Sequence, residues 1–247
     1  MYIYQNRFLT YCVLFYNEKL QKIPSADVYK LNQYAVKGFL NTTFTTIHID
    51  LTKVENDIFS NFEKNTKYEI NRALQKDSLT VSDVDMDSEL IVFMNAYDEF
   101  AKSKNLPLLN RKELQLLVDS SLLVIRKIND SNQQTLVYHS YITTDDRARL
   151  LHSFSFYRTK ESSNKSLIGR ANRLLHWNDI LYFKNNQIKV YDLGGIDTDI
   201  LNSETQAINK FKHCFGGKIV TEYNVQNPGS IKGFIYLLGK KCKILKI

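Results

Sequence analysis

The sequence predicts a mixed α/β protein with a central, largely antiparallel sheet flanked by helices. Three consecutive stretches with a two-residue hydrophobic period predict the sheet, at residues 122–129, 135–144 and 149–157. Stretches with a period of three to four residues lie on both sides of them and predict helices. Because the 247 residues include only nine glycines and three prolines, most of the chain is expected to form regular structure.

Five elements are expected before the three strands. The alternating, β-branched residues 44–51 predict a strand, residues 55–76 predict one or two helices with a basic face, and residues 79–84 predict a short strand. Residues 88–104 predict an amphipathic helix. A further helix at about 110–120 begins at Asn110, and Glu113 follows three residues later as in a capping box.

The remaining elements follow from the turns and from the return of helical periodicity. Polar turns at 130–132 and 145–146 join the three strands into an antiparallel meander. A long helix at 166–184, a strand at 188–193, a helix at 203–214 and a strand at 218–225 come next. Gly216 and Gly217 are expected to end the third of these elements in the left-handed conformation. The tail, residues 230–247, fits either a helix or a strand.

Composition excludes several classes of protein. A hydrophobic fraction of 43% with 12% aromatic residues can form a packed core, which excludes a disordered chain. No apolar run approaches the roughly 20 residues of a membrane span, and the apolar residues 8–16 lack a signal-peptide cleavage site. The three cysteines lie far apart without metal-binding spacing. The sequence therefore predicts no disulfide framework and no structural metal site, and a cytoplasmic location.

The positive charge is concentrated at one end of the chain. Residues 208–247 carry eight lysines and one acidic residue, Glu222, which equals the whole net charge of +7. A basic end on a neutral body predicts an anionic partner there: phosphates, nucleic acid or an acidic membrane face.

Two motifs carry groups suited to ligand binding. The segment YDLGG, from Tyr191 to Gly195, places Asp192 at a strand end before a flexible pair, where α/β proteins commonly bind ligands. The alternative is that Asp192 only caps a turn. The start of the long helix offers free backbone N–H groups for a phosphate, although an ordinary solvated basic face fits it equally. The residues concerned there are Lys165, Gly169, Arg170 and Ala171.

Histidines and a lysine are the remaining candidates for chemistry. His139 and His152 lie on neighbouring predicted strands and are candidate proton acceptors, but two histidines make an incomplete metal site. Lys212 falls at a pocket edge or on the surface. His213 and Cys214 project about 100° apart on a helix, which does not suit a nucleophile pair.

Taken together, these segments resemble one family. GRANRLLHWNDILYFKNNQIKVYDLGGID at 169–197, followed by AINKFKHCFGG at 207–217, resembles the C-terminal acyltransferase half of the Fem-type proteins. These proteins form the FemABX-like branch of the GNAT superfamily of N-acyltransferases. KNTKYEINRALQKDSLTV at 64–81 resembles the basic helix and strand of the same family, so the resemblance covers about residues 60–225.

The resemblance implies a GNAT-like fold, in which a mixed sheet splays at its middle and admits an acyl donor. It implies a short, divergent N-terminal GNAT-like half at 1–85 and a GNAT-like acyltransferase domain at 86–247. Better-known members transfer an aminoacyl group from aminoacyl-tRNA to a peptidoglycan precursor, and related shorter members are associated with acyl-CoA donors and surface sugars. The usual pyrophosphate loop is matched only by Gly169 and Ala171, and Ser166 replaces its first residue.

The resemblance also assigns roles to individual residues. Phe211 and Lys212 match the Phe-Lys pair near the acyl donor, where the lysine meets a phosphate or the developing oxyanion. Arg72 matches a basic position that meets acceptor phosphate. The other matches, expected to bind substrate or to support the architecture, are Asn172, His176, Trp177, Tyr191, Asp192, Gly194 and Gly195.

The leading hypothesis is an N-acyltransferase that moves an acyl group from a carrier-bound donor such as acyl-CoA to an amine. The acceptor would be a cell-surface glycan precursor such as a nucleotide-linked amino sugar. No cofactor is expected to be bound tightly, and the proton acceptor is expected among Asp192, His139 and His152. The alternatives are an aminoacyl-tRNA-dependent Fem-type transferase and a catalytically degenerate binding module. Peripheral contact between the basic C-terminus and the inner membrane face is a further expectation, and DNA binding is not expected.

Overall fold

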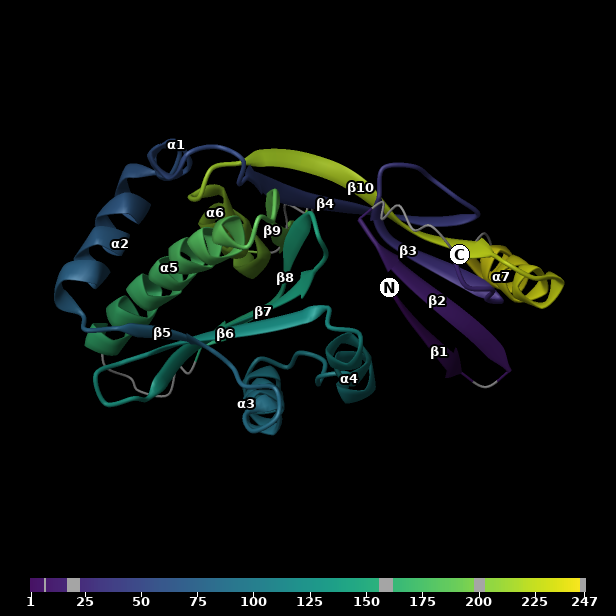
Figure 1. Cartoon of the computed structure of the whole chain (residues 1–247), viewed down its shortest axis with the longest axis horizontal. Helices are drawn as coiled ribbons and strands as arrows, with labels where there is room; N and C mark the ends of the chain where they lie inside the picture. Colours follow the sequence, from purple (N-terminus) through teal and green to yellow (C-terminus); the bar gives the residue numbers. More distant parts are fainter. Residues whose placement is uncertain (7, 17–22, 156–161, 198–202, 245–247) are drawn as a thin grey trace. The chain divides into compact units, whose positions relative to one another are not determined.

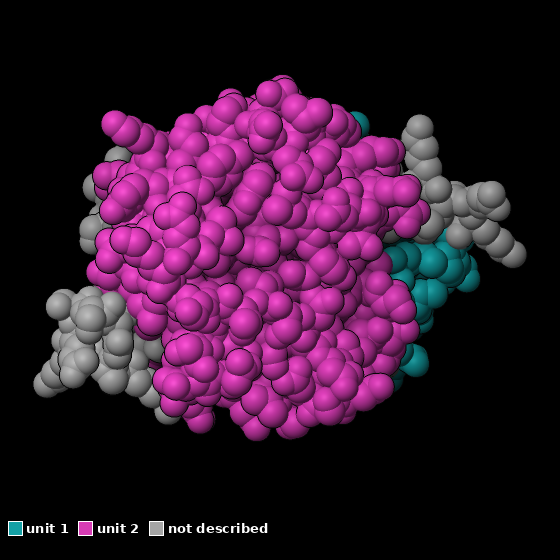
Figure 2. Space-filling model, turned by 60° about the vertical axis from the view of Figure 1, so that its left-hand side comes forward, with its two compact units in different colours: residues 1–46, 195–199, 219–247 teal, residues 47–194, 200–218 magenta. Residues whose placement is uncertain are grey.

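The chain forms two compact units. The computed structural model describes residues 1–6, 8–16, 23–155, 162–197 and 203–244. Unit 1 comprises Met1–Thr46, Gly195–Asp199 and Ile219–Ile247, and unit 2 comprises Ile47–Gly194 and Ile200–Lys218 (Figure 2). The sequence predicts a domain boundary between residues 85 and 86, which is not where these two units meet. That boundary stays a prediction.

Unit 2 contains the predicted meander. Its strands β5 to β8 pair in order and antiparallel, and β9 pairs with β8 in parallel (Figure 1). The fold is therefore mixed α/β with a mostly antiparallel sheet, as predicted. The strands are β5 (Thr80–Asp83), β6 (Leu123–Asn129), β7 (Thr135–Thr143), β8 (Arg147–Ser155) and β9 (Val190–Gly195).

Helices flank both faces of this sheet. The helices α5 and α6 lie on one face, and α3 and α4 lie on the other (Figure 1). The helix α2 packs against α5. The helices of unit 2 are α1 (Glu55–Ser60), α2 (Lys64–Lys76), α3 (Leu90–Ser103), α4 (Arg111–Asp119), α5 (Ser162–Asn185) and α6 (Ser203–His213).

Local signals fix two of the helix ends. Asn110 caps α4, because its Oδ1 accepts a hydrogen bond from the backbone N–H of Glu113 at 3.3 Å. Gly216 and Gly217 follow α6 with φ angles of 68° and 93°, the left-handed conformation that the sequence predicts. The predicted start of the long helix at residue 166 is wrong: α5 begins four residues earlier, at Ser162.

Apolar side chains on both faces of the sheet of unit 2 are buried. They include Ile125 and Ile128 on β6, Phe93 on α3 and Leu175 on α5. Burying one such side chain contributes about 1.5–3 kcal/mol. Trp177 on α5 contacts the rings of Phe59 and Phe62, with ring centroids 4.9 and 5.6 Å away, and so fixes α1 and the following turn to α5.

Unit 1 is a small sheet with one helix. The strand β2 pairs antiparallel with β1 and parallel with β3, and β3 pairs antiparallel with β10. The strand β4 carries the chain from unit 1 into unit 2. The elements are β1 (Tyr2–Asn6), β2 (Leu9–Phe15), β3 (Val28–Tyr34), β4 (Leu40–Asp50), β10 (Lys218–Pro228) and α7 (Ile231–Ile244).

In the described part of the ambiguous tail, Ile231–Ile244 form the helix α7, which packs closely against the chain. Leu237 is fully buried in a cluster with Leu9, Tyr11 and Val28. A Cβ atom at Gly233 would stand 1.7 Å from the carbonyl oxygen of Asp27, so only glycine permits this approach. Within the described part of the chain, no helix combines the length and the apolar character needed to cross a bilayer.

Candidate functional site

The strands β8 and β9 pair over only three residues and then stop pairing. The paired residues are Arg147 with Val190, Ala148 with Tyr191, and Arg149 with Asp192. Beyond them β8 runs on to Ser155 and β9 to Gly195. The ladder between β8 and β9 therefore ends at Arg149 and Asp192. We call the region just past these two residues the opening between β8 and β9, because the resemblance implies a sheet that splays at its middle to admit an acyl donor.

Lys212 of α6 lies at this opening. A Cβ atom at Gly194 would stand 3.7 Å from Lys212 Nζ, and 2.7 Å from the carbonyl oxygen of Leu150 on β8. Burial lowers the pKa of Lys212 to about 8, with Asp192 acting in the opposite direction and Arg149 adding to the decrease. The side chain is therefore mostly protonated at neutral pH, and it places a cation where the pairing of the two strands ends.

Asp192 shapes this opening from the strand side. Its carboxylate is fully buried, and its Oδ1 accepts a hydrogen bond of 2.8 Å from the backbone N–H of Gly194. Its Oδ2 lies 3.4 Å from His48 Nε2 and 3.6 Å from a guanidinium nitrogen of Arg147. The bond to Gly194 is the turn-capping arrangement that the sequence left open as an alternative. The other carboxylate oxygen faces the basic side chains of His48 and Arg147. The role of Asp192 as a proton acceptor stays a prediction.

A buried network centred on Asp179 lies on the α5 face of the sheet. Asp179 is fully buried, and its Oδ1 accepts a hydrogen bond of 2.6 Å from Arg126 Nε. Its Oδ2 lies 2.7 Å from His139 Nδ1 and accepts a 2.5 Å bond from the hydroxyl of Tyr141. The other ring nitrogen of His139 lies 2.8 Å from Asn172 Oδ1. Both nitrogens of His139 are thus engaged within the protein, which favours a structural role over that of a proton acceptor.

The network continues towards α6 through two tyrosines and a histidine. The hydroxyls of Tyr141 and Tyr191 are 2.8 Å apart, and that of Tyr191 is 2.7 Å from His176 Nδ1. Burial raises the pKa of both tyrosines well above 10, with the charge of Asp179 adding to the increase. Burial lowers the pKa of His176 well below 6.5, and His139 and Lys212 add to the decrease. The neutral ring of His176 also packs 5.7 Å from the ring of Phe211.

His139 and His152 do not face each other. On the paired strands His139 lies opposite Ser153, and His152 lies opposite Ser140, so the two side chains point to opposite faces of the sheet. His152 Nδ1 is 2.9 Å from Ser140 Oγ, and its ring is 4.6 Å from that of Tyr97 on α3. Burial lowers the pKa of His152 to about 4, and Arg149 adds to the decrease. The structure therefore separates two residues that the sequence grouped together.

The residues predicted to cradle a phosphate lie inside α5. Since the helix begins at Ser162, Gly169, Arg170 and Ala171 are no longer in its first turn. The guanidinium of Arg170 makes two hydrogen bonds, of 2.5 and 3.0 Å, to Asp77 at the end of α2, and Ala171 is fully buried. This geometry joins α5 to α2. Lys165 is exposed in the first turn of α5, so it lies at the helix start, where all four residues were predicted to lie.

Three further residues were predicted to bind donor or substrate: Phe211, Arg72 and Trp177. Phe211 precedes Lys212 on α6, and the guanidinium of Arg173 lies 5.1 Å from its ring centroid. Arg72 is exposed on α2. Trp177 serves the packing of α1 on α5, as described above. None of the contacts of these residues tests their predicted roles in substrate binding, which stay predictions.

The sequence reasoning missed Arg126, Tyr141 and Asp179 of this network, and it also missed His48, which lies against Asp192. A signal for two of them was present. Asn172, His176 and Asp179 are spaced by four and three residues, which places three polar groups on one face of α5. Tyr141 follows His139 by two residues, which places it on the same face of β7.

Comparisons with known proteins agree with this architecture. No family model and no curated protein sequence matches the chain. The crystal structure of FemX matches with a TM-score of 0.60 at 11% identity, over 83% of this chain and 64% of FemX. The chain thus spans slightly less than two thirds of that protein.

Two further structures match with similar extent. The C-terminal domain of a protein from Agrobacterium fabrum named as a lysylphosphatidylglycerol synthetase has a TM-score of 0.52 at 11% identity, over 85% of this chain and 71% of that one. L-PGS from Bacillus licheniformis has a TM-score of 0.51 at 8% identity, over 86% of this chain and 72% of that one. The predicted resemblance to Fem-type proteins is therefore confirmed at the level of the fold, which this chain shares with FemX.

Proposed function

We propose that the protein is an N-acyltransferase that works at the opening between β8 and β9. The observation that carries the proposal is the position of Lys212 Nζ beside Gly194, where the paired part of these strands ends. A cation there can stabilise the negative charge that develops on a carbonyl oxygen during acyl transfer, usually the largest single contribution to catalysis. The fold shared with FemX supports the same reading.

The proposed reaction needs no covalent enzyme intermediate. An uncharged amine of the acceptor attacks the carbonyl carbon of a thioester or ester donor, and a carbon–nitrogen bond forms. The oxyanion so produced lies next to Lys212, and the bond from carbon to the carrier sulfur or oxygen then breaks. The amine proton leaves to water, and the departing carrier group takes up a proton. The contribution of the chain is positioning and charge stabilisation.

The donor we propose is an acyl-CoA or a similar carrier-bound acyl group, and the acceptor is an amino sugar of a glycan precursor. Two cations near Phe211 suit the phosphate groups of such a donor: Lys212, which follows it in the chain, and Arg173, whose guanidinium lies 5.1 Å from its ring. Aminoacyl-tRNA offers the same combination of ester and phosphates, so the experiment has to compare the two donors directly.

A melting-temperature panel on the full chain tests the proposal. The probes are acetyl-CoA, longer acyl-CoAs, aminoacyl-tRNA and nucleotide-linked amino sugars, each with the wild type and with Lys212→Ala. A donor at about 100 times its Kd stabilises the wild type by about 2.7 kcal/mol, and the variant should lose most of that increase. A response to aminoacyl-tRNA alone would replace the proposed donor. No response to any donor would favour a binding module without transferase activity.

A further inference from the structure

Helix α7 presents a row of large apolar side chains to solvent. Ile231, Ile235 and Leu238 are 82%, 65% and 43% exposed. At about 100° per residue these three positions fall within an arc of about 60°, roughly opposite the side formed by Gly233 and Leu237 that packs on unit 1. Exposed apolar residues are common singly, but a row on one helix face indicates a surface that is covered in use.

Lysines flank this apolar row on both sides. On the same helical projection Lys232 and Lys243 lie on one side of the row and Lys241 lies on the other. The helix contains no acidic residue. An apolar strip bordered by lysines, on a helix of modest length, is the pattern of helices that lie in the interface of a bilayer with anionic lipids.

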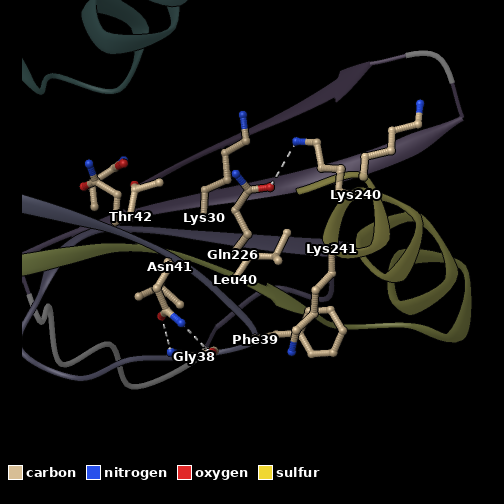
Figure 3. Close-up of a pocket in the computed structure, with 13 residues that line it drawn as sticks. Lys30, Gly38, Phe39, Leu40, Asn41, Thr42, Gln226, Lys240 and Lys241 are labelled. Atoms are coloured by element: carbon tan, nitrogen blue, oxygen red, sulfur yellow. Dashed lines mark hydrogen bonds between the residues drawn. The ribbon is translucent and has the colours of Figure 1, made fainter. Parts of the chain in front are cut away.

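A basic pocket adjoins the C-terminal end of the helix. It has a volume of about 720 Å³, and Lys240, Lys241 and Lys243 of α7 line it together with Lys30 of β3 (Figure 3). The side chain of Lys240 hydrogen-bonds Gln226 Oε1 at 3.4 Å. Four lysines around one cavity provide the donors and the positive potential that a phosphate group requires.

We propose that α7 is a docking surface for a bilayer containing anionic phospholipid. The row of Ile231, Ile235 and Leu238 enters the boundary between headgroups and acyl chains, and Lys232, Lys241 and Lys243 beside it meet the headgroup phosphates. The lysines beside the row favour an anionic bilayer over a second copy of the chain as its partner. A second copy of α7 on this face would bring lysines against lysines, whereas an anionic bilayer satisfies the apolar row and the lysines together. This inference goes beyond the proposed transferase activity and does not depend on it.

Co-sedimentation of the full chain with vesicles tests the proposal. The vesicles contain phosphatidylcholine with about 30% phosphatidylglycerol, or phosphatidylcholine alone. We expect binding to the anionic vesicles that weakens as salt rises, and at least tenfold weaker binding to the neutral ones. The triple variant Ile231→Gln, Ile235→Gln, Leu238→Gln should lose binding by about tenfold or more. The double variant Lys241→Gln, Lys243→Gln should lose about fivefold for each lysine removed.

A matched control carries the same chemical change elsewhere. Ile91 and Val92 on α3 are 55% and 54% exposed, so Ile91→Gln with Val92→Gln makes the same kind of change at two exposed apolar residues and should leave vesicle binding unchanged. Circular dichroism verifies that each variant is folded. Equal binding to both kinds of vesicle, or no binding to either, would overturn the proposal. So would a concentration-dependent dimer that the triple variant abolishes, or an increase in melting temperature with inorganic phosphate in the absence of vesicle binding.

Discussion

The ammonium group of Lys212 lies beside Gly194, so that a Cβ atom at that glycine would stand 3.7 Å from Lys212 Nζ. The contact joins the end of α6 to the strand β9 just past Asp192, the last residue of β9 that pairs with β8. Asp192 holds the backbone N–H of Gly194 at 2.8 Å and so fixes the turn that Lys212 meets. The proposed site is built on this approach of the Lys212 cation of α6 to Gly194 of β9.

Replacing Gly194 with alanine should damage this arrangement. Its φ of 74° is strained for a residue with a side chain, and the new Cβ would stand 2.7 Å from the carbonyl oxygen of Leu150. We expect Gly194→Ala to lower the free energy of unfolding by about 1–3 kcal/mol in urea denaturation. Gly169→Ala is the control, because its Cβ would meet only the end of the Arg173 side chain at 3.6 Å. It should be neutral or stabilising by up to about 1 kcal/mol. Equal losses in both variants would contradict the account.

The pH dependence of acyl transfer should report the protonation of Lys212. With a pKa of about 8, the lysine is a cation below that pH and loses its charge above it. If the cation stabilises the oxyanion, the rate should fall as pH rises through about 8. Lys212→Arg should shift this fall to higher pH, since arginine stays protonated. A wild-type rate that is constant up to pH 10, measured with an acceptor whose amine is already uncharged, would argue against the role of the cation.

Removing Asp179 should destabilise unit 2 strongly. Its carboxylate is fully buried and accepts a hydrogen bond of 2.6 Å from the buried Arg126. Asp179→Ala leaves this arginine with the more exposed Asp83 as its carboxylate partner among the described residues. We expect a loss of about 3 kcal/mol in the free energy of unfolding, because a buried cation loses its main counter-charge.

The control for this variant is Asp146→Asn. Asp146 pairs with Lys189 at 2.6 Å on the surface, where both side chains are more than 60% exposed. Screening by solvent makes such a pair nearly neutral for stability. If both variants lowered the free energy of unfolding by a similar amount, the buried network of Asp179 would contribute no more to stability than a surface ion pair.

His152 should make the protein less stable in mild acid. The folded state holds its pKa at about 4, against 6.5 for the unfolded chain, because burial disfavours the charged ring. The stabilisation is complete above pH 6.5 and is lost as pH falls towards 4, since only the unfolded state binds the proton in that range. Between pH 7 and 5 the free energy of unfolding should fall by about 2 kcal/mol from this residue. His152→Gln should be less sensitive to pH over that range by the same amount. An identical pH dependence in the variant and the wild type would refute the assignment.

Much of unit 2 could be predicted from the sequence because its patterns are local. The meander followed from three stretches of two-residue periodicity, and the end of α6 followed from Gly216 and Gly217. The start of α5 could not be placed, because Ser162 is preceded by polar residues that give no apolar period. The strands β1 to β3 were also missed. The pairing of β3 with β10 joins the two ends of the chain and leaves no local pattern, whereas β1 and β2 form a local hairpin that sequence distance does not explain.

The site was predictable only in part. Lys212, Gly194 and Asp192 were chosen from motifs, and the structure brings them together. His139 and His152 were grouped because they occupy neighbouring strands, but whether they share a face depends on pairing register, which composition does not reveal. Arg170 was read as a phosphate ligand, because its partner Asp77 lies 93 residues away in the chain.

The central claim is that Lys212 supports acyl transfer at the opening between β8 and β9, and the most direct test is the rate of transfer with a labelled donor. The assay follows acyl label from acyl-CoA to a nucleotide-linked amino sugar for the wild type, Lys212→Met and Lys210→Met. Lys210 is exposed on the same helix and provides the control. We predict that Lys212→Met lowers kcat by about 100- to 1,000-fold, with the fold retained, and that Lys210→Met has the wild-type rate. Unchanged transfer by Lys212→Met would contradict the account.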